Sequence, residues 1–183
     1  MRWPRPGLEL QALNGGSPFE GSGLYYVPVE HAGNQNRSSE EVEAVQRIVT
    51  RLLGPGVSWT DSRGAARRLT QSDILIVAPY NAQVAALASR LPGMRVGTVD
   101  RFQGQQAPVV IYSMTSSSAE DAPRGMGFLF NPNRLNVATS RAQCACILAA
   151  APRLFEPECT SPEQMRWANG LCRYRELAEE VDI

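Results

Sequence analysis

The chain has 183 residues, of which 43% are hydrophobic and 20% charged, which is the size and balance of one globular domain. All 18 basic residues are arginine, so the chain cannot complete a G-x-x-x-x-G-K-[ST] phosphate-binding loop or form a lysine Schiff base. Because 18 acidic residues balance the arginines, nucleic-acid binding would need a local arginine surface. No stretch approaches the ~20 apolar residues of a membrane span, and we expect a soluble, cytoplasmic protein without a membrane partner.

Cysteine and histidine give no sign of a metal site. The four cysteines contain no C-x-x-C pair, and the single histidine, His31, lies far from them in the sequence. Cys144 and Cys146 stand two apart in an apolar run, so on a strand they would share one face as ordinary core residues. We therefore expect reduced cysteines and no bound metal.

Strand and helix patterns alternate along most of the chain. Apolar runs rich in β-formers predict strands at 24–29, 74–78, 95–99, 109–113 and 144–150. Apolar residues at helical spacing predict helices at about 40–53, 82–91, 134–142 and 161–180, with Ser38 or Ser39 capping the first. This alternation favours an α/β fold, a mainly parallel sheet of about five strands flanked by helices.

Three segments carry weaker patterns. Residues 1–23 hold five glycines and three prolines, so we expect a poorly ordered leader, with the domain running from 24 to 183. The polar stretch 59–71 indicates a surface excursion. Residues 116–132 offer few apolar anchors, and we expect a long, mobile loop. In parallel sheets ligands bind at the carboxyl ends of strands, so chemistry should lie in the loops after Ala78, Thr98, Ser113 and Ala150.

Two polar segments stand out, Thr-Val-Asp-Arg-Phe-Gln-Gly-Gln-Gln at 98–106 and Asn-Arg-Leu-Asn-Val-Ala-Thr-Ser-Arg-Ala at 133–142. They resemble motifs V and VI of superfamily 1 helicases in order and separation, and Ile-Val-Ala-Pro-Tyr-Asn-Ala-Gln at 76–83 resembles motif IV. The resemblance covers about 24–181 and is greatest to the branch of RNA-surveillance and replication-associated helicases, including bacterial helicases fused to a RecB-like nuclease. It implies a RecA-like, P-loop NTPase-like fold, specifically the second (C-terminal) RecA-like domain, with 101–106 and 134–141 on one rim of the sheet.

The resemblance also implies how ATP is handled. In these helicases the first RecA-like domain supplies the phosphate-binding loop and the magnesium carboxylates, so ATP and Mg²⁺ would act only in the full-length protein and none would bind this fragment. Arg141 matches the arginine finger, a planar cation that stabilises charge on a transferring phosphoryl group. Gln103 matches the catalytic glutamine beside the γ-phosphate, and Gly104 follows it. Gln106 stands where the family usually has a ribose-binding glutamate. Arg134, seven residues before the finger, shares its helical face and could line the same cleft.

The implied partners are the first RecA-like domain and a single strand, expected to be DNA, with a RecB-like nuclease module in the same protein as a further candidate. Thr98, Pro79, Tyr80 and Gln83 match positions that face the strand or the cleft. For each of them a plain structural role is the alternative; Tyr80, for example, could simply pack.

Three other classes of function compete with this interpretation. A non-catalytic RecA-like nucleic-acid-binding or interaction module is favoured by Gln106 and disfavoured by the joint presence of Gln103, Gly104 and Arg141. A Rossmann-type enzyme lacks a glycine-rich fingerprint after any strand, and Arg-Gly-Met-Gly at 124–127 indicates a flexible turn. A nuclease centre is disfavoured because Asp100 has no second carboxylate nearby in the sequence.

Overall fold

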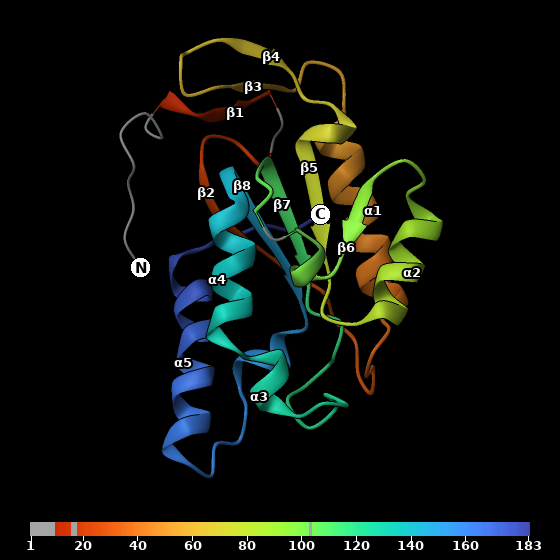
Figure 1. The fold of residues 1–183 in the computed structure, drawn as a ribbon, viewed down its shortest axis with the longest axis vertical. Coiled ribbons are helices and arrows are strands. Elements are labelled where there is room, and N and C mark those ends of the chain that lie inside the picture. Colours follow the sequence, from red (N-terminus) through yellow and green to blue (C-terminus); the bar gives the residue numbers. More distant parts are fainter. Residues whose placement is uncertain (1–9, 16–17, 103) are drawn as a thin grey trace.

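The computed structural model describes residues 10–15, 18–102 and 104–183. Its main feature is a six-stranded sheet in which every pairing is parallel, as expected from the alternating pattern (Figure 1). The strand order across the sheet is β6 (Arg95–Gly97), β5 (Ile74–Val77), β7 (Ala107–Ser113), β8 (Ala142–Ala150), β2 (Gly23–Pro28) and β9 (Glu179–Glu180). All five predicted strands are confirmed, and Pro28 lies at the end of its strand.

Helices cover both faces of this sheet. Helices α1 (Ser39–Leu52) and α2 (Asn81–Arg90) lie on one face, and α3 (Met126–Leu129), α4 (Pro132–Arg141) and α5 (Pro162–Leu177) lie on the other (Figure 1). Alternate residues of each strand feed the two cores. On β5, Leu75 and Val77 pack towards α4 and α5, whereas Ile74 and Ile76 pack towards α1 and α2. The α/β class is therefore confirmed, and no helix among the described residues is long and apolar enough to cross a membrane.

Local sequence signals set the ends of the helices. Ser38 caps α1, because its hydroxyl accepts a hydrogen bond from the Glu41 backbone N–H at 3.1 Å. Three short 3₁₀ turns connect other elements: η2 (Gln71–Asp73), η3 (Val99–Phe102) and η4 (Pro152–Phe155). The last helix ends at Leu177, earlier than expected, since Glu179 and Glu180 pair with Tyr25 and Tyr26 as β9.

A second, antiparallel sheet lies across the top of the view in Figure 1. It is formed by β1 (Ala12–Asn14), β3 (Ser58–Thr60) and β4 (Ala66–Arg68), so part of the polar excursion is a hairpin. The expected lack of order at 1–23 does not hold where this region is described. Leu13 and Phe19 are buried, and the Phe19 ring meets Tyr25 edge-on at 5.4 Å. Residues 1–9, 16 and 17 lie outside the described part of the chain.

Two further expectations were wrong. The pairing of β7 with β8 contains a β-bulge, so Cys144 packs on the α1 side and Cys146 on the α4 side rather than on one face. The segment 116–132 is not an unanchored loop. Met126, Leu129 and Phe130 are buried in the core on the α4 side of the sheet. These three side chains anchor the segment, although its composition as a whole is only weakly hydrophobic.

Candidate functional site

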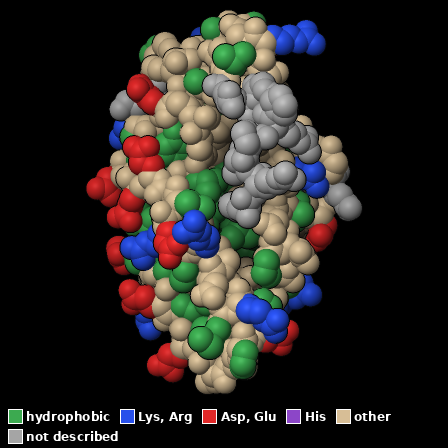
Figure 2. Space-filling model, turned by 90° about the vertical axis from the view of Figure 1, so that its left-hand side faces the viewer, with side chains coloured by type: hydrophobic (Ala, Val, Ile, Leu, Met, Phe, Trp, Pro, Cys, Tyr) green, Lys and Arg blue, Asp and Glu red, His purple; other side chains and the backbone are tan. Residues whose placement is uncertain are grey.

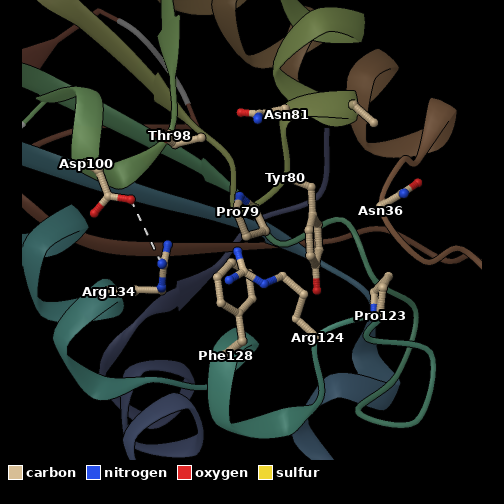
Figure 3. A pocket seen from close by; sticks show the side chains of 11 residues that line it. Asn36, Pro79, Tyr80, Asn81, Thr98, Asp100, Pro123, Arg124, Phe128 and Arg134 are labelled. Carbon is tan, nitrogen blue, oxygen red and sulfur yellow. Dashed lines mark ion pairs between the residues drawn. The ribbon is translucent and has the colours of Figure 1, made fainter.

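A cavity of about 480 Å³ opens at the carboxyl ends of β5 and β6 (Figure 3). Its walls come from five separate segments: the loop before α1, the start of α2, the loop after β6, the segment 116–132, and the first turn of α4. The lining residues are Asn36, Pro79, Tyr80, Asn81, Ala82, Thr98, Asp100, Pro123, Arg124, Phe128 and Arg134. The cavity therefore lies at the edge where ligands bind in parallel sheets, and the loops after Ala78, Thr98 and Ser113 contribute to its walls.

Two arginines and two aromatic rings form one wall of the cavity. The guanidinium carbons of Arg124 and Arg134 lie 4.0 and 4.1 Å from the centroid of the Phe128 ring, which is cation–π geometry. The Tyr80 ring lies 5.6 Å from the same centroid, at an interplanar angle of 34° (Figure 3). Both arginines are thus held in place by a ring, and the cavity presents aromatic and cationic groups side by side.

The wall carries more positive than negative charge. Arg134 faces Asp100 at 3.9 Å, but that carboxylate is 79% exposed, so the pair is weak. Arg124 forms no ion pair with any residue that the structure describes. Elsewhere the charges are mixed: on the face shown in Figure 2, arginine and acidic side chains stand among one another. The excess of arginine at the cavity is therefore local, which is the arrangement that a neutral chain needs to bind an anion.

Two buried phenols belong to this region: Tyr80 in the wall itself and Tyr112 on the neighbouring strand β7. Burial raises the pKa of Tyr80, so its hydroxyl stays protonated, and it lies 3.5 Å from the Ser116 hydroxyl. Burial also raises the pKa of Tyr112, and the positive charge of Arg134 partly offsets that rise. The Tyr112 hydroxyl is buried without a hydrogen-bond partner among the described residues, so it keeps a free donor near the cavity.

Gln83 does not reach the cavity, contrary to the expectation that it contacts nucleic acid. Its side chain is fully buried, and its Oε1 accepts from the Ser38 backbone N–H at 2.9 Å. Its Nε2 donates to the Ser38 carbonyl at 3.2 Å and to the Ser113 hydroxyl at 2.9 Å. The amide is therefore fully used in tying the start of α1 to the end of β7.

A buried polar network continues from this amide. Glu41, the chain's only histidine His31, and the end of β7 meet where the sheet's carboxyl edge joins α1. Glu41 accepts from the Ser113 hydroxyl and from the Thr115 backbone N–H at 2.8 Å, and its other oxygen lies 3.1 Å from His31. Thr115 has φ of 76°, a conformation that costs about 1 kcal/mol or more for a β-branched residue, and the bond to Glu41 helps to hold it. The first residues after Ser113 are thus held to α1 by this network, and the cavity-lining residues Pro123 and Arg124 follow further along the same loop.

A second group of predicted residues lies at the opposite, amino edge of the sheet. Gln106 and Arg141 directly precede Ala107 and Ala142, which are paired residues at the start of β7 and β8. Gly104 adopts φ of 82°, which favours glycine, and both Gly104 and Gln106 are exposed. The Nε atom of Arg141 is buried without a hydrogen-bond partner among the described residues. Gln103 lies outside the described part of the chain.

Helix α4 connects the two groups. It runs from the cavity, where Arg134 faces Asp100, to the amino edge, where Arg141 is its last residue. The described part of 101–106 and the helix segment 134–141 therefore lie side by side, with η3 packed on α4. The expectation that both lie on one rim of the sheet was wrong, because each runs from the carboxyl edge towards the amino edge. Arg134 and Arg141 are separated by two helical turns, about 10 Å, so Arg134 belongs to the cavity and not to the Arg141 group.

The sequence interpretation missed Arg124 and Phe128. Both lie in the segment that was expected to be a mobile loop. The apolar run Met-Gly-Phe-Leu-Phe at 126–130 was the available signal, because such a run rarely stays in solvent. Asp100, set aside as a nuclease carboxylate, instead pairs with Arg134.

A parallel sheet covered on both faces by helices is an α/β architecture and is consistent with a RecA-like domain. A family model described as an AAA domain matches residues 27–153, and the chain belongs to that family.

Individual relatives agree with this assignment. The chain is 29% identical over 166 residues to the regulator of nonsense transcripts 1 homolog of Drosophila melanogaster, covering 84% of this chain and 12% of that protein. It is 30% identical over 137 residues to "Putative helicase mov-10-B.1" of Danio rerio, covering 66% and 13% respectively. It is 37% identical over 96 residues to "Probable RNA helicase armi" of Drosophila melanogaster, covering 48% and 8%. The resemblance to a RecA-like domain of superfamily 1 helicases, in the RNA-surveillance branch, is confirmed. The chain spans at most 13% of the length of these three relatives.

Proposed function

We propose that this chain is the second motor domain of an ATP-dependent superfamily 1 helicase, completing a nucleotide cleft with a first RecA-like domain. The observation that supports this most is the placement of Gln106 and Arg141. These residues, from two separate motifs, lie at the amino ends of the adjacent strands β7 and β8. A module with only a structural role has no physical need for an arginine and a glutamine next to each other at the amino edge of the sheet.

The Arg141 group suits a nucleotide anion. A guanidinium has five donors, and the buried Nε of Arg141 has no partner among the described residues, so donors remain for phosphate oxygens. When bound, ATP with Mg²⁺ supplies the phosphoryl transfer that drives such motors. Arg141 would stabilise the charge that develops there, and Gln103 would act beside it as the second catalytic residue.

Gly104 and Gln106 would complete the nucleotide contacts from this chain. The positive φ of Gly104 turns the backbone sharply between η3 and β7, which leaves room for close approach. Gln106 is exposed and keeps a carbonyl acceptor for a ribose hydroxyl, without the charge of a glutamate. Arg134 is better assigned to the cavity at the carboxyl edge.

We propose that the cavity side of the domain contacts the single strand through Thr98, Pro79 and Tyr80, which all line it. The motif resemblance favours DNA, whereas one relative is named as an RNA helicase. The test therefore uses both single-stranded DNA and single-stranded RNA. A RecB-like nuclease module in the same protein and a cytoplasmic location remain proposals that rest on the same resemblance.

The test is ATP hydrolysis by the full-length protein with and without single-stranded DNA or RNA. Arginine fingers contribute on the order of 10³–10⁵ in rate, so Arg141→Ala should abolish strand-stimulated turnover. Arg141→Lys should rescue poorly, because an ammonium lacks the planar fork of a guanidinium. Arg173→Ala, which removes an exposed arginine on α5, is the matched control and should leave turnover unchanged.

The outcome also separates the two leading functions. If Arg141→Ala keeps normal turnover, or the full-length protein hydrolyses no ATP, the motor assignment is wrong. The non-catalytic nucleic-acid-binding or interaction module would then be the better interpretation.

A further inference from the structure

We propose that the cavity at the carboxyl edge holds one nucleotide unit of the bound strand, with its phosphate between Arg124 and Arg134 and its base against Tyr80 and Phe128. The inference rests on the proposed function and goes beyond it. The motif positions include neither Arg124 nor Phe128, and they imply contact with the strand but no pocket for a base.

The phosphate position follows from the two cation–π contacts. Because both guanidinium carbons lie about 4 Å from one ring centroid, they are at most about 8 Å apart. One phosphate beside the Phe128 ring would therefore lie close to both cations, and a guanidinium is a strong hydrogen-bond donor to phosphate oxygens. Among the described residues, Arg134 forms an ion pair with Asp100, whose carboxylate is largely in solvent, and Arg124 forms none. An anion here would offset the repulsion between two like charges.

The base position follows from the aromatic rings and the size of the cavity. Tyr80 and Phe128 supply ring surface, and nucleobases of any sequence stack on aromatic rings and on guanidinium planes. The volume of about 480 Å³ is within the range of small-molecule sites, ~300–1,000 Å³. Asn36, Asn81 and Thr98 add polar groups around these rings (Figure 3). The cavity thus combines stacking surface, hydrogen-bonding groups and cations, the three requirements of a nucleotide.

The same chemistry would suit a free nucleoside monophosphate. We commit to the strand as its source, because Pro79, Tyr80 and Thr98, the positions that match strand contacts, line the same cavity. The experiment therefore needs an oligonucleotide and a mononucleotide as separate probes.

The test is photocrosslinking of the 183-residue chain to oligo(U) and oligo(dT) that carry one 5-iodouracil, followed by peptide mapping. Crosslinks should map to Tyr80 or Phe128, and uridine or thymidine monophosphate should compete only weakly. In parallel, fluorescence anisotropy measures binding of the same oligonucleotides against salt concentration. Phe128→Leu, which keeps an apolar side chain, should weaken binding by about fivefold or more through lost stacking.

Arg124→Ala should weaken binding and reduce the salt slope by about 0.7, the loss of one phosphate contact. Arg173→Ala, another exposed arginine, should change neither. Equal thermal midpoints for all variants exclude misfolding as the cause.

If the strand binds normally to Arg124→Ala and Phe128→Leu and crosslinks elsewhere in the chain, the pocket is refuted while the proposed function stands. If the monophosphate binds as tightly as the strand, the cavity takes a free nucleotide and the strand inference is refuted. If the unmodified chain binds no strand, the strand inference is refuted, and the proposed function is decided separately by ATP hydrolysis of the full-length protein.

Discussion

Replacing Gln83 with alanine distinguishes a structural amide from a nucleic-acid contact. The substitution removes three hydrogen bonds, of 2.9, 3.2 and 2.9 Å, and leaves the Ser38 backbone groups and the Ser113 hydroxyl buried without that partner. At about 1 kcal/mol for each bond, the free energy of unfolding should fall by ~3 kcal/mol. For a chain of this size, each kcal/mol lowers the melting temperature by ~2–4 °C, so the expected drop is ~6–12 °C.

Differential scanning fluorimetry and urea unfolding measure this loss, and the matched control is Gln106→Ala. That glutamine is exposed, and its replacement should change stability by less than ~0.5 kcal/mol. If Gln83→Ala melts with the parent chain but binds a single strand much more weakly, our assignment of Gln83 is wrong and the side chain is a ligand contact after all.

Three further outcomes are expected. Gly97→Ala should lower the free energy of unfolding in urea by ~1–3 kcal/mol. The reason is that a Cβ at this position would lie 2.6 Å from Arg101 Cδ and 3.2 Å from the buried Phe102 ring. An unchanged urea midpoint would contradict the tight packing of η3 on β6. Burial opposes ionisation of Asp73, but hydrogen bonds from Arg67 and Thr70 hold the pKa of that carboxyl below its usual range. The contribution of this carboxylate to the free energy of unfolding is therefore complete above about pH 4, and it is lost as the pH falls through the lower pKa of the folded state. In urea unfolding, Asp73→Asn should make the free energy of unfolding less dependent on pH in this acid range. Calorimetry of the isolated chain with ATP and Mg²⁺ should give no micromolar dissociation constant, because the proposed function assigns the phosphate-binding loop and the magnesium ligands to another domain. Micromolar binding would contradict that division of the site between two domains.

The main sheet was predictable because its strands are short apolar runs between clear turn signals. The 74–78 run, for example, has no polar residue, which is typical of a parallel strand covered on both faces. The two-residue strand β9 was not predictable, since Glu179 and Glu180 pair only through the backbone and carry no β pattern. The bulge in β8 was missed for a related reason: one extra residue in a strand leaves the composition unchanged but reverses the side on which later residues pack.

The candidate site was only partly predictable for a different reason. Motif spacing selected Thr98, Tyr80 and Arg141 as candidates, but it carries no information on which edge of the sheet each residue reaches. That information depends on the path of 98–106 and of α4, which both cross from one edge to the other. Gln83 is the clearest example of what motif spacing cannot predict. The sequence contains a polar residue at the start of a helix, and it does not show whether the side-chain amide is in solvent or forms three buried hydrogen bonds.

Helix α4 passes into β8 without a connecting residue: Arg141 ends the helix and Ala142 begins the strand. A loop would absorb a displacement, whereas a helix joined directly to a strand that is paired on both sides is anchored to the sheet at that end. Its first turn holds Arg134 in the cavity, and its last residue is Arg141 at the other edge. Helix α4 therefore connects the two proposed binding sites as one continuous element with no loop between the helix and the strand.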